Sequence, residues 1–180
     1  NPTNNKYFGE YHLKKDNIEK ALSEFKISIG NPDLESDIKV KLILNLSNYY
    51  KDKLSNEHIE SLVDLLILTH PNIPDGHALK AEILISEDNL EAAGNELILV
   101  LEKEKENYLI WEQLIAIDSE LGNNEEMYKH SKEAISYFPN YPKFLLFNGF
   151  ACGKTNRIEE GIKILDIGAD LVIDQPELEA

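Results

Sequence analysis

A repeat of 34 residues constrains this chain more than any other feature of its sequence. Pro71 and Pro139 stand two such steps apart, and each follows a segment whose apolar residues recur at every third or fourth position. That spacing is typical of amphipathic helices, and a proline just past such a segment stops the helix from continuing. Repeats of about 20–50 residues indicate stacked helical or β units, each of which buries its apolar face against its neighbours.

Counting from the two prolines divides the whole chain, residues 1–180, into repeat units of one predicted solenoid domain. A four-residue insertion separates the first unit from the second, so that the units are about 2–35, 40–73, 74–107, 108–141 and 142–175. Loops of only a few residues join the predicted helices, so consecutive helices are expected to be antiparallel neighbours. The apolar periodicity predicts helices at residues 6–15, 18–29, 36–52, 57–69, 75–86, 89–104, 108–121, 124–137, 142–153 and 157–172.

Two sets of equivalent positions predict how the helices of a unit pack. The eighth position is small in four of the five units, which favours a close approach of the first helix to its partner; it holds Gly9, Ser47, Ala81, Ile115 and Gly149. On the second helix, the twentieth, twenty-fourth and twenty-seventh positions form a stripe at i, i+4 and i+7. In the first unit this stripe is Ala21, Phe25 and Ser28. We expect it to be core.

These positions resemble the tetratricopeptide repeat (TPR), a 34-residue helix-turn-helix unit. The residues that carry the resemblance are Trp111, Leu114, Leu121-Gly122, Ala134 and Pro139 in the fourth unit, with Phe8-Gly9, Ala21-Leu22 and Phe25 in the first. The resemblance implies an all-α, right-handed superhelical α-solenoid of about five TPR-like repeats, as a fragment of a longer bacterial-type TPR protein. Three departures are polar side chains in positions that are usually apolar, namely Lys80, Asp118 and Asn148.

Both ends are expected to be truncated. Residues 2–5 are similar to the tail of a preceding unit, but they lie too close to Gly9 for a full first helix. The last helix carries apolar residues without a following polar capping helix, and residues 175–179 are similar to the first turn of another unit. A competing explanation is a homodimer that buries the same face, so self-association through the exposed terminal repeats is a second expectation.

Composition argues against several classes of function. Eighteen basic and 33 acidic side chains give a net charge of −15, which disfavours nucleic-acid partners. One cysteine forms no internal disulfide, and no apolar run approaches the roughly 20 residues that span a bilayer. No signal peptide or initiator Met is present, so the targeting region is expected to lie outside this fragment and the compartment, cytoplasmic or exported, stays unknown.

The pattern of potentially reactive residues predicts no enzyme, no metal and no cofactor. The five histidines form no helical metal pair, and Cys152 occupies a position that is usually core. The segment 149–155 resembles the end of a phosphate-binding loop, but its glycines have the wrong spacing and lie in a predicted helix. The region from Gly153 to Asn156 is expected instead to form the turn between paired helices, with Thr155 or Asn156 as a cap.

The TPR resemblance also implies a concave groove, lined by the first helices of the units, that receives an extended peptide or a helix. Amides in this groove are expected to bond a ligand backbone, and aromatic side chains to hold an apolar anchor. Leu44, Ala78 and Glu112 stand where the family's carboxylate clamp has basic groups, so chaperone tails are not expected. The predicted partner-binding residues are Asn45, Asn48, Leu79, Glu82, Glu112, Gln113, Phe147 and Phe150.

Three functional hypotheses follow. The first is a non-catalytic scaffold that binds a protein or peptide partner, of unknown identity, in the groove. The second is an assembly module whose terminal faces join further repeats or another copy. The third is a glycan-binding or small-molecule-binding accessory protein, which needs aromatic platforms; the candidates are Trp111, Phe147 and Phe150, and Trp111 is expected to be core.

Overall fold

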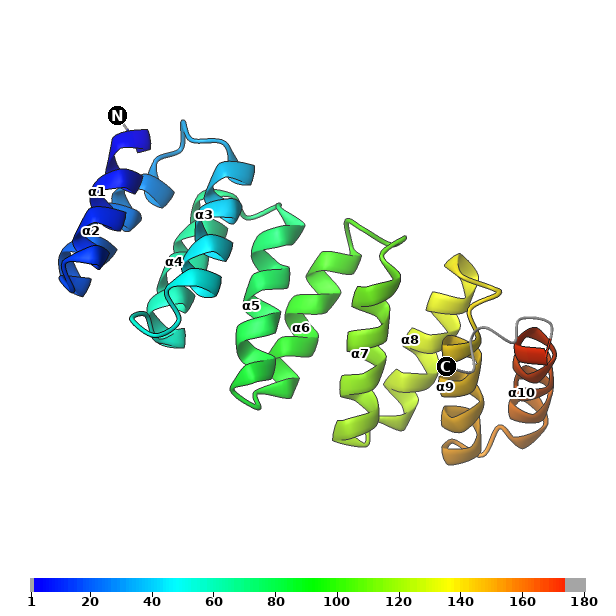
Figure 1. Ribbon diagram of the computed structural model, residues 1–180. Coiled ribbons are helices and arrows are strands. Elements are labelled where there is room, and N and C mark those ends of the chain that lie inside the picture. The colour runs from blue at the N-terminus through cyan, green and yellow to red at the C-terminus, as the bar shows by residue number, and fades with distance from the viewer. Residues whose placement is uncertain (1, 174–180) are drawn as a thin grey trace. The chain divides into compact units, whose positions relative to one another are not determined.

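The computed structural model describes residues 2–173, and within them it contains ten α-helices and no strand (Figure 1). The all-α class predicted from the sequence is therefore confirmed, and each predicted helix has its counterpart. The helices are α1 (Pro2–Lys14), α2 (Ile18–Gly30), α3 (Ser36–Tyr49), α4 (Asn56–Thr69), α5 (Pro74–Ser86), α6 (Leu90–Leu101), α7 (Tyr108–Leu121), α8 (Asn124–Tyr137), α9 (Pro142–Lys154) and α10 (Ile158–Ile173).

The chain divides into two compact units, Asn1–Asp88 with α1 to α5 and Asn89–Ala180 with α6 to α10. In the first unit α2 packs against α1 and α4, while α3 and α5 both pack against α4. In the second unit each helix packs against the next one along the chain. The finer division into five repeats stays a prediction from the sequence.

Local signals at the helix starts explain why the helices begin where they do. Pro74 and Pro142 open α5 and α9, where the missing amide proton costs no hydrogen bond. The side chain of Asn107 accepts a hydrogen bond from the Ile110 amide at the start of α7, at 3.4 Å. At α4, Ser55 caps the His58 amide and the His58 ring accepts from the Ser55 amide, so two free amides are satisfied together.

The turns within the hairpins share one backbone conformation. Asp16, Asp88, Gly122 and Asn156 have φ angles of 56°, 60°, 72° and 62°, in the left-handed region. The last three are 34 residues apart, and Asp16 is their equivalent in the first hairpin. Glycine, asparagine and aspartate are the residues that adopt this region most readily. The α3–α4 hairpin differs because a longer connection, residues 50–55, leads to the Ser55 cap.

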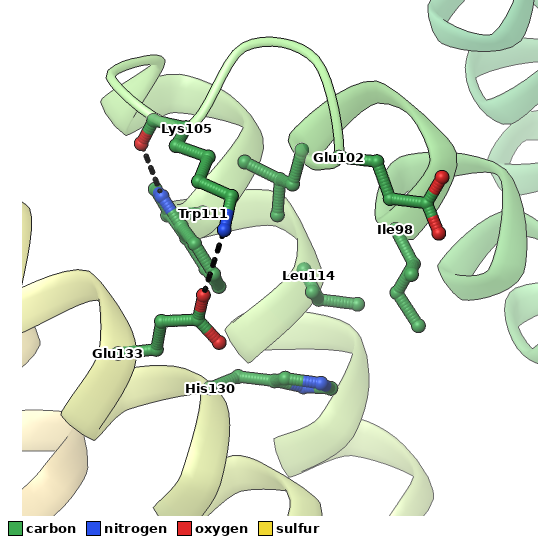
Figure 2. A pocket seen from close by; sticks show the side chains of 8 residues that line it. Ile98, Glu102, Lys105, Trp111, Leu114, His130 and Glu133 are labelled. Atoms are coloured by element: carbon green, nitrogen blue, oxygen red, sulfur yellow. Dashed lines mark hydrogen bonds and ion pairs between the residues drawn. The ribbon is translucent and has the colours of Figure 1, made fainter.

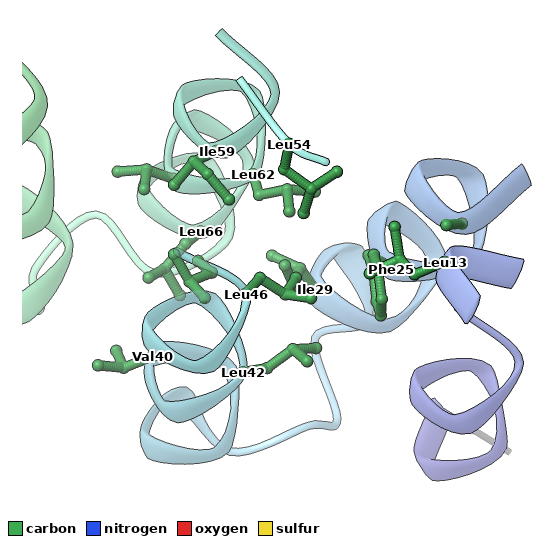
Figure 3. Close-up of a cluster of buried hydrophobic side chains, with 13 residues drawn as sticks. Leu13, Phe25, Ile29, Val40, Leu42, Leu46, Leu54, Ile59, Leu62 and Leu66 are labelled. Carbon is green, nitrogen blue, oxygen red and sulfur yellow. The ribbon is translucent and has the colours of Figure 1, made fainter. Parts of the chain in front are cut away.

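The core of the first unit lies between α2, α3 and α4, with Leu13 at the end of α1 (Figure 3). Phe25 and Ile29 from α2 are fully buried there with Leu62 and Leu66 from α4. Gly9 makes the close approach predicted at the eighth position, since a Cβ on it would lie 2.3 Å from Cε1 of Phe25. A small residue is therefore required where α1 crosses α2.

The predicted stripe on the second helices is core on α6 and α8 of the second unit. Ala93, Leu97 and Val100 on α6 are at most 1% exposed, and Ser131 and Ala134 on α8 are fully buried. At the last hairpin, Gly149 of α9 approaches Leu165 of α10 so closely that a Cβ would lie 2.4 Å from Cγ. Leu165 itself is 40% exposed, so α10 buries its stripe only in part.

Three local predictions were wrong. Residues 2–5 are not the tail of another unit, because α1 begins at Pro2 and proline is suited to the first helical position. Ser47 is exposed near the end of α3, so the small residue there is not buried against a partner helix. Gly153 lies within α9, whose helix ends at Lys154, so the turn begins at Thr155. The expected further unit at residues 175–179 lies outside the described residues.

Candidate functional site

The eight predicted partner-binding residues fall into two sets of four, one in each compact unit, and all stand on the first helices of hairpins. The first unit holds Asn45 and Asn48 on α3 with Leu79 and Glu82 on α5; the second holds Glu112 and Gln113 on α7 with Phe147 and Phe150 on α9.

In the first unit the predicted residues differ in exposure. Asn45 and Asn48 are exposed on one face of α3, three residues apart, and Glu82 is exposed on α5. Leu44 beside them is 38% exposed. Leu79 is half-buried and packs against the core of this unit, so most of its surface contacts the protein itself.

In the second unit a polar junction ties α7 to α9. Lys143 donates a hydrogen bond through Nζ to Oε2 of Glu112 at 2.6 Å, and the Tyr141 hydroxyl donates to Oε1. Burial raises the pKa of Glu112, but the hydrogen bonds from Lys143 and Tyr141 outweigh burial and hold that pKa below its ordinary value. The hydrogen bond to Glu112 raises the pKa of Tyr141 to about 12. The carboxylate therefore stays charged and the phenol neutral at physiological pH.

Exposed apolar side chains flank this junction. Leu109 on α7 is 55% exposed, and Leu146 and Phe150 on α9 are 60% and 50% exposed. Phe147 is half-buried, and Gln113 is exposed with both its amide donor and acceptor. We call Leu109, Glu112, Gln113, Lys143, Leu146 and Phe150 together the α7–α9 face; it combines exposed apolar side chains with an ion pair and a side-chain amide.

The three polar residues at usually apolar positions each have a partner inside the protein. Lys80 of α5 bonds Glu60 and Asp64 of α4, at 2.7 Å each. Asp118 of α7 lies 2.7 Å from Nδ1 of His130 on α8. Buried polar groups with partners avoid the desolvation cost of unpaired ones, so these departures are compatible with the fold.

The third, Asn148 of α9, donates to Oγ of Ser131 and to the backbone oxygen of Tyr128, at 2.9 and 3.1 Å. It is 1% exposed, and Ser131 is fully buried on α8. This polar contact therefore joins two successive hairpins where an apolar contact was expected.

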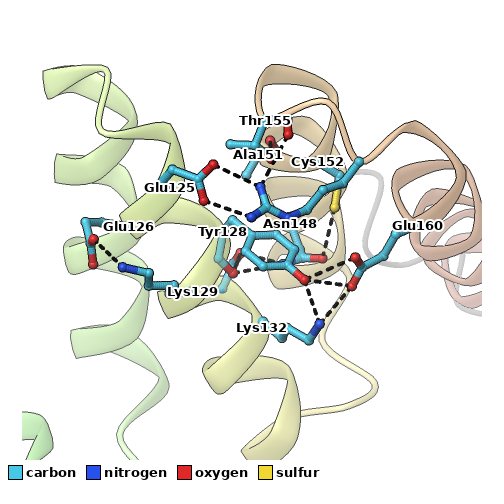
Figure 4. Close-up of polar contacts among 12 residues, drawn as sticks. Glu125, Glu126, Tyr128, Lys129, Lys132, Asn148, Ala151, Cys152, Thr155 and Glu160 are labelled. Atoms are coloured by element: carbon cyan, nitrogen blue, oxygen red, sulfur yellow. Dashed lines mark hydrogen bonds and ion pairs between the residues drawn. The ribbon is translucent and has the colours of Figure 1, made fainter.

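A polar cluster between α8 and α10, which the sequence did not indicate, surrounds Tyr128 (Figure 4). The Tyr128 hydroxyl bonds Glu160 at 3.0 Å, and Lys132 bonds the same carboxylate at 2.9 Å. The Arg157 guanidinium lies 4.2 Å from the centre of the Tyr128 ring and forms two hydrogen bonds with Glu125. The hydrogen bond from Lys132, followed by that from Tyr128, lowers the pKa of Glu160. Because these groups satisfy one another, the cluster connects helices and offers no free reactive group.

Other candidate chemistry is also accounted for within the fold. Cys152 is fully buried, and burial raises the pKa of its thiol, as a core position predicts. Trp111 is 3% exposed and donates through Nε1 to the Lys105 backbone oxygen at 2.8 Å, so it is core and not an exposed platform. Residues 149–154 of the loop-like segment are helical.

Residues 2–173 bring together no group of three or more His, Cys, Asp or Glu side chains that would hold a metal ion. In the same part of the chain no helix has both the length and the apolar character needed to cross a membrane.

Comparisons with known proteins agree with this architecture. No protein-family model matches the chain. Among curated proteins the chain is similar to human Tetratricopeptide repeat protein 21A, with 26% identity over 162 residues. The match covers 88% of this chain but 12% of the human protein, so the chain spans a small part of that relative's length.

Among solved structures the chain is similar to those of MamA. A crystal structure of MamA has 14% identity and a TM-score of 0.64, over 94% of this chain and 96% of that chain. MamA AMB-1 has 16% identity and a TM-score of 0.65, over 94% and 91%. MamA 41-end from Desulfovibrio magneticus RS-1 has 14% identity and a TM-score of 0.61, over 97% and 96%. At these identities the likeness shows the fold alone. The chain is therefore an all-α arrangement of helical hairpins that shares its fold with MamA and is similar in sequence to a tetratricopeptide repeat protein.

Proposed function

We propose that this protein is a non-catalytic interaction scaffold that binds a peptide or protein partner on its first helices, with the α7–α9 face as the main contact. The observation that carries the proposal is the exposure of Leu109, Leu146 and Phe150 around the Glu112–Lys143 pair. Exposed apolar side chains that are rimmed by polar groups mark interaction surfaces, and large anchors supply most of the binding energy. Gln113 and, in the first unit, Asn45 and Asn48 provide amides for a partner's backbone.

The test places a photo-cross-linking phenylalanine analogue at residue 150 or 146 in cells of the source organism. The control carries it at Leu68 of α4, which is 77% exposed and stands on a second helix. We expect a discrete adduct from positions 146 and 150 that is weakened by Leu109→Asp and absent from position 68. Equal adducts at all three positions, or none at 146 and 150, would contradict the proposed site.

A second candidate function is assembly, which the terminal helices favour. On α10, Ile158 and Ile162 are 53% and 56% exposed. Ile162 is 34 residues after Tyr128 and is therefore its equivalent in the last hairpin. The backbone oxygen of Tyr128 accepts a hydrogen bond from the side chain of Asn148 in the next hairpin. On α1, Phe8 is 56% exposed, whereas its equivalent Leu46 is 1% exposed. Both terminal helices therefore expose apolar residues where internal helices contact a neighbour.

Analytical ultracentrifugation over a concentration series tests assembly. If these faces join copies of the chain, the mass rises with concentration and Ile162→Asp abolishes the rise, whereas Leu68→Asp on exposed α4 surface leaves it unchanged. A monomer at every concentration would remove self-association from consideration.

A further inference from the structure

A groove on the second unit lies apart from the α7–α9 face. α6 and α8 both pack against α7, and two adjoining cavities of about 170 and 290 Å³ are lined by residues of these three helices and of the connections beside them. Ile98, Leu114 and His130 line both cavities, so the two adjoin in one depression. Figure 2 shows the first cavity and the side chains that line it. We call this depression the α6–α8 groove.

The floor of the α6–α8 groove is apolar and held in place. Trp111 and Leu114 are 3% and 2% exposed, and the Trp111 ring stacks with Tyr137 at 6.3 Å between centroids. The polar atoms at the floor are already paired, because Trp111 donates to Lys105 and His130 bonds Asp118. An apolar side chain that enters the groove therefore leaves no polar group of the floor without a partner.

The edges of the groove expose apolar surface. Ile98 of α6 is 38% exposed, and Leu121 at the end of α7 is 42% exposed. Both line the cavities, so a ligand meets apolar side chains on entry as well as at the floor. When an apolar ligand group covers this surface, the removal of apolar area from water contributes favourably to the free energy of binding.

The rim is acidic. Glu91 and Glu102 on the α6 side and Glu126 and Glu133 on α8 all line the two cavities. Lys129 pairs with Glu126 at 2.6 Å, and Lys105 lies 3.9 Å from Glu133. In the part of the chain that the structure describes, no ion pair involves Glu91 or Glu102. The net charge of −15 adds to the negative potential around them.

We propose that the α6–α8 groove is a second docking surface, whose occupant is a basic amphipathic peptide segment of a protein partner. The apolar side chains of this peptide contact Ile98 and Leu114, and the lysines or arginines of the peptide pair with Glu91 and Glu102. Amphipathic helices dock in apolar grooves in this way, and complementary charge adds specificity and association rate. An anionic ligand is disfavoured by the carboxylates. This surface is separate from the α7–α9 face, so each proposal stands or fails alone.

A peptide of leucine and lysine in helical periodicity, 14 residues long like α8, serves as the probe. Trp111 is the single tryptophan and lines the groove, so its fluorescence reports occupancy, and a labelled peptide gives affinity by anisotropy. We expect saturable binding with a change in Trp111 emission. A matched peptide with glutamate in place of lysine is expected not to bind.

Ile98→Lys and Leu99→Lys form the decisive pair. The two residues are adjacent on α6, are 38% and 39% exposed, and change the net charge equally, but Leu99 does not line either cavity. We expect Ile98→Lys to weaken peptide binding about tenfold or more relative to Leu99→Lys, because an apolar contact is replaced by a like charge. Circular dichroism melts check that both variants fold.

If Ile98→Lys does not fold, Glu102→Lys and Glu106→Lys replace the pair, because both residues are exposed and only Glu102 lines the groove. Equal weakening by the two members of a pair overturns the proposal. So does an absence of saturable binding, equal binding of the glutamate peptide, or a peptide cross-link that maps to the α7–α9 face.

Discussion

Replacing Gly9 by alanine measures how tightly α1 packs on α2. The added Cβ would lie 2.3 to 2.7 Å from three ring carbons of Phe25, and Phe25 is fully buried, so its ring has no solvent to move into. Such overpacking costs about 1–3 kcal/mol. Alanine is better than glycine in a helix by about 1 kcal/mol, which offsets part of that cost. We therefore expect Gly9→Ala to lower the free energy of unfolding by up to about 2 kcal/mol.

Gly153→Ala is the matched control, because Gly153 is also helical but a Cβ there would have no neighbour within 4 Å. Because alanine has a higher helix propensity than glycine, we expect Gly153→Ala to raise the free energy of unfolding by up to about 1 kcal/mol. The difference between the two variants isolates the packing cost. Urea unfolding followed by circular dichroism supplies both values, with Trp111 fluorescence as a separate signal from the second unit. The packing argument is refuted if Gly9→Ala stabilises the protein as much as Gly153→Ala does.

Two predictions concern single side chains. Cys152 is the one cysteine, and it should react with a thiol reagent at mildly alkaline pH only when denaturant is added. The reason is that the thiol is buried and its pKa is raised. Rapid labelling of the folded protein would contradict this prediction. The pKa of Tyr141 should fall from about 12 towards that of an ordinary tyrosine in Glu112→Gln, as measured by ultraviolet absorbance during an alkaline titration. Since the folded-state pKa of Glu112 is lowered, its stabilising contribution is present above the ordinary carboxyl pKa and is lost as the pH falls through the folded value. The stability gap between wild type and Glu112→Gln should therefore narrow in acid, and a gap that widens would contradict the assignment.

Much of the helical architecture could be predicted from local sequence. The apolar periodicity and the prolines at 71 and 139 locate the helices, because helix periodicity and helix stops are local properties. The start of α1 was missed, since Pro2 was interpreted as following a helix and not as opening one. A proline is compatible with both positions, and only the residues around it in space distinguish them.

The candidate site was predictable only in part. The repeat pattern indicated which residues stand on first helices, and exposure then distinguished Phe150 from the half-buried Leu79. The cluster around Tyr128 was missed because its partners come from positions that a repeat pattern treats as surface. The 32-residue spacing of Glu125 and Arg157, which places opposite charges at the start of α8 and just before α10, was a signal that could have found it.

The amino-acid sequence by itself determined that this chain forms helical hairpins, because the 34-residue period, the small residue at Gly9 and the turn residues Asp88, Gly122 and Asn156 act through backbone preference and short-range sterics. Only the tertiary structure decided which polar side chains are satisfied and which apolar ones stay exposed. Asp118 is tolerated because His130 lies beside it, and Ile162 is exposed because no described helix covers it. Burial and pairing depend on residues far apart along the chain, and a periodic pattern specifies the faces of a helix but not the neighbour that meets each face.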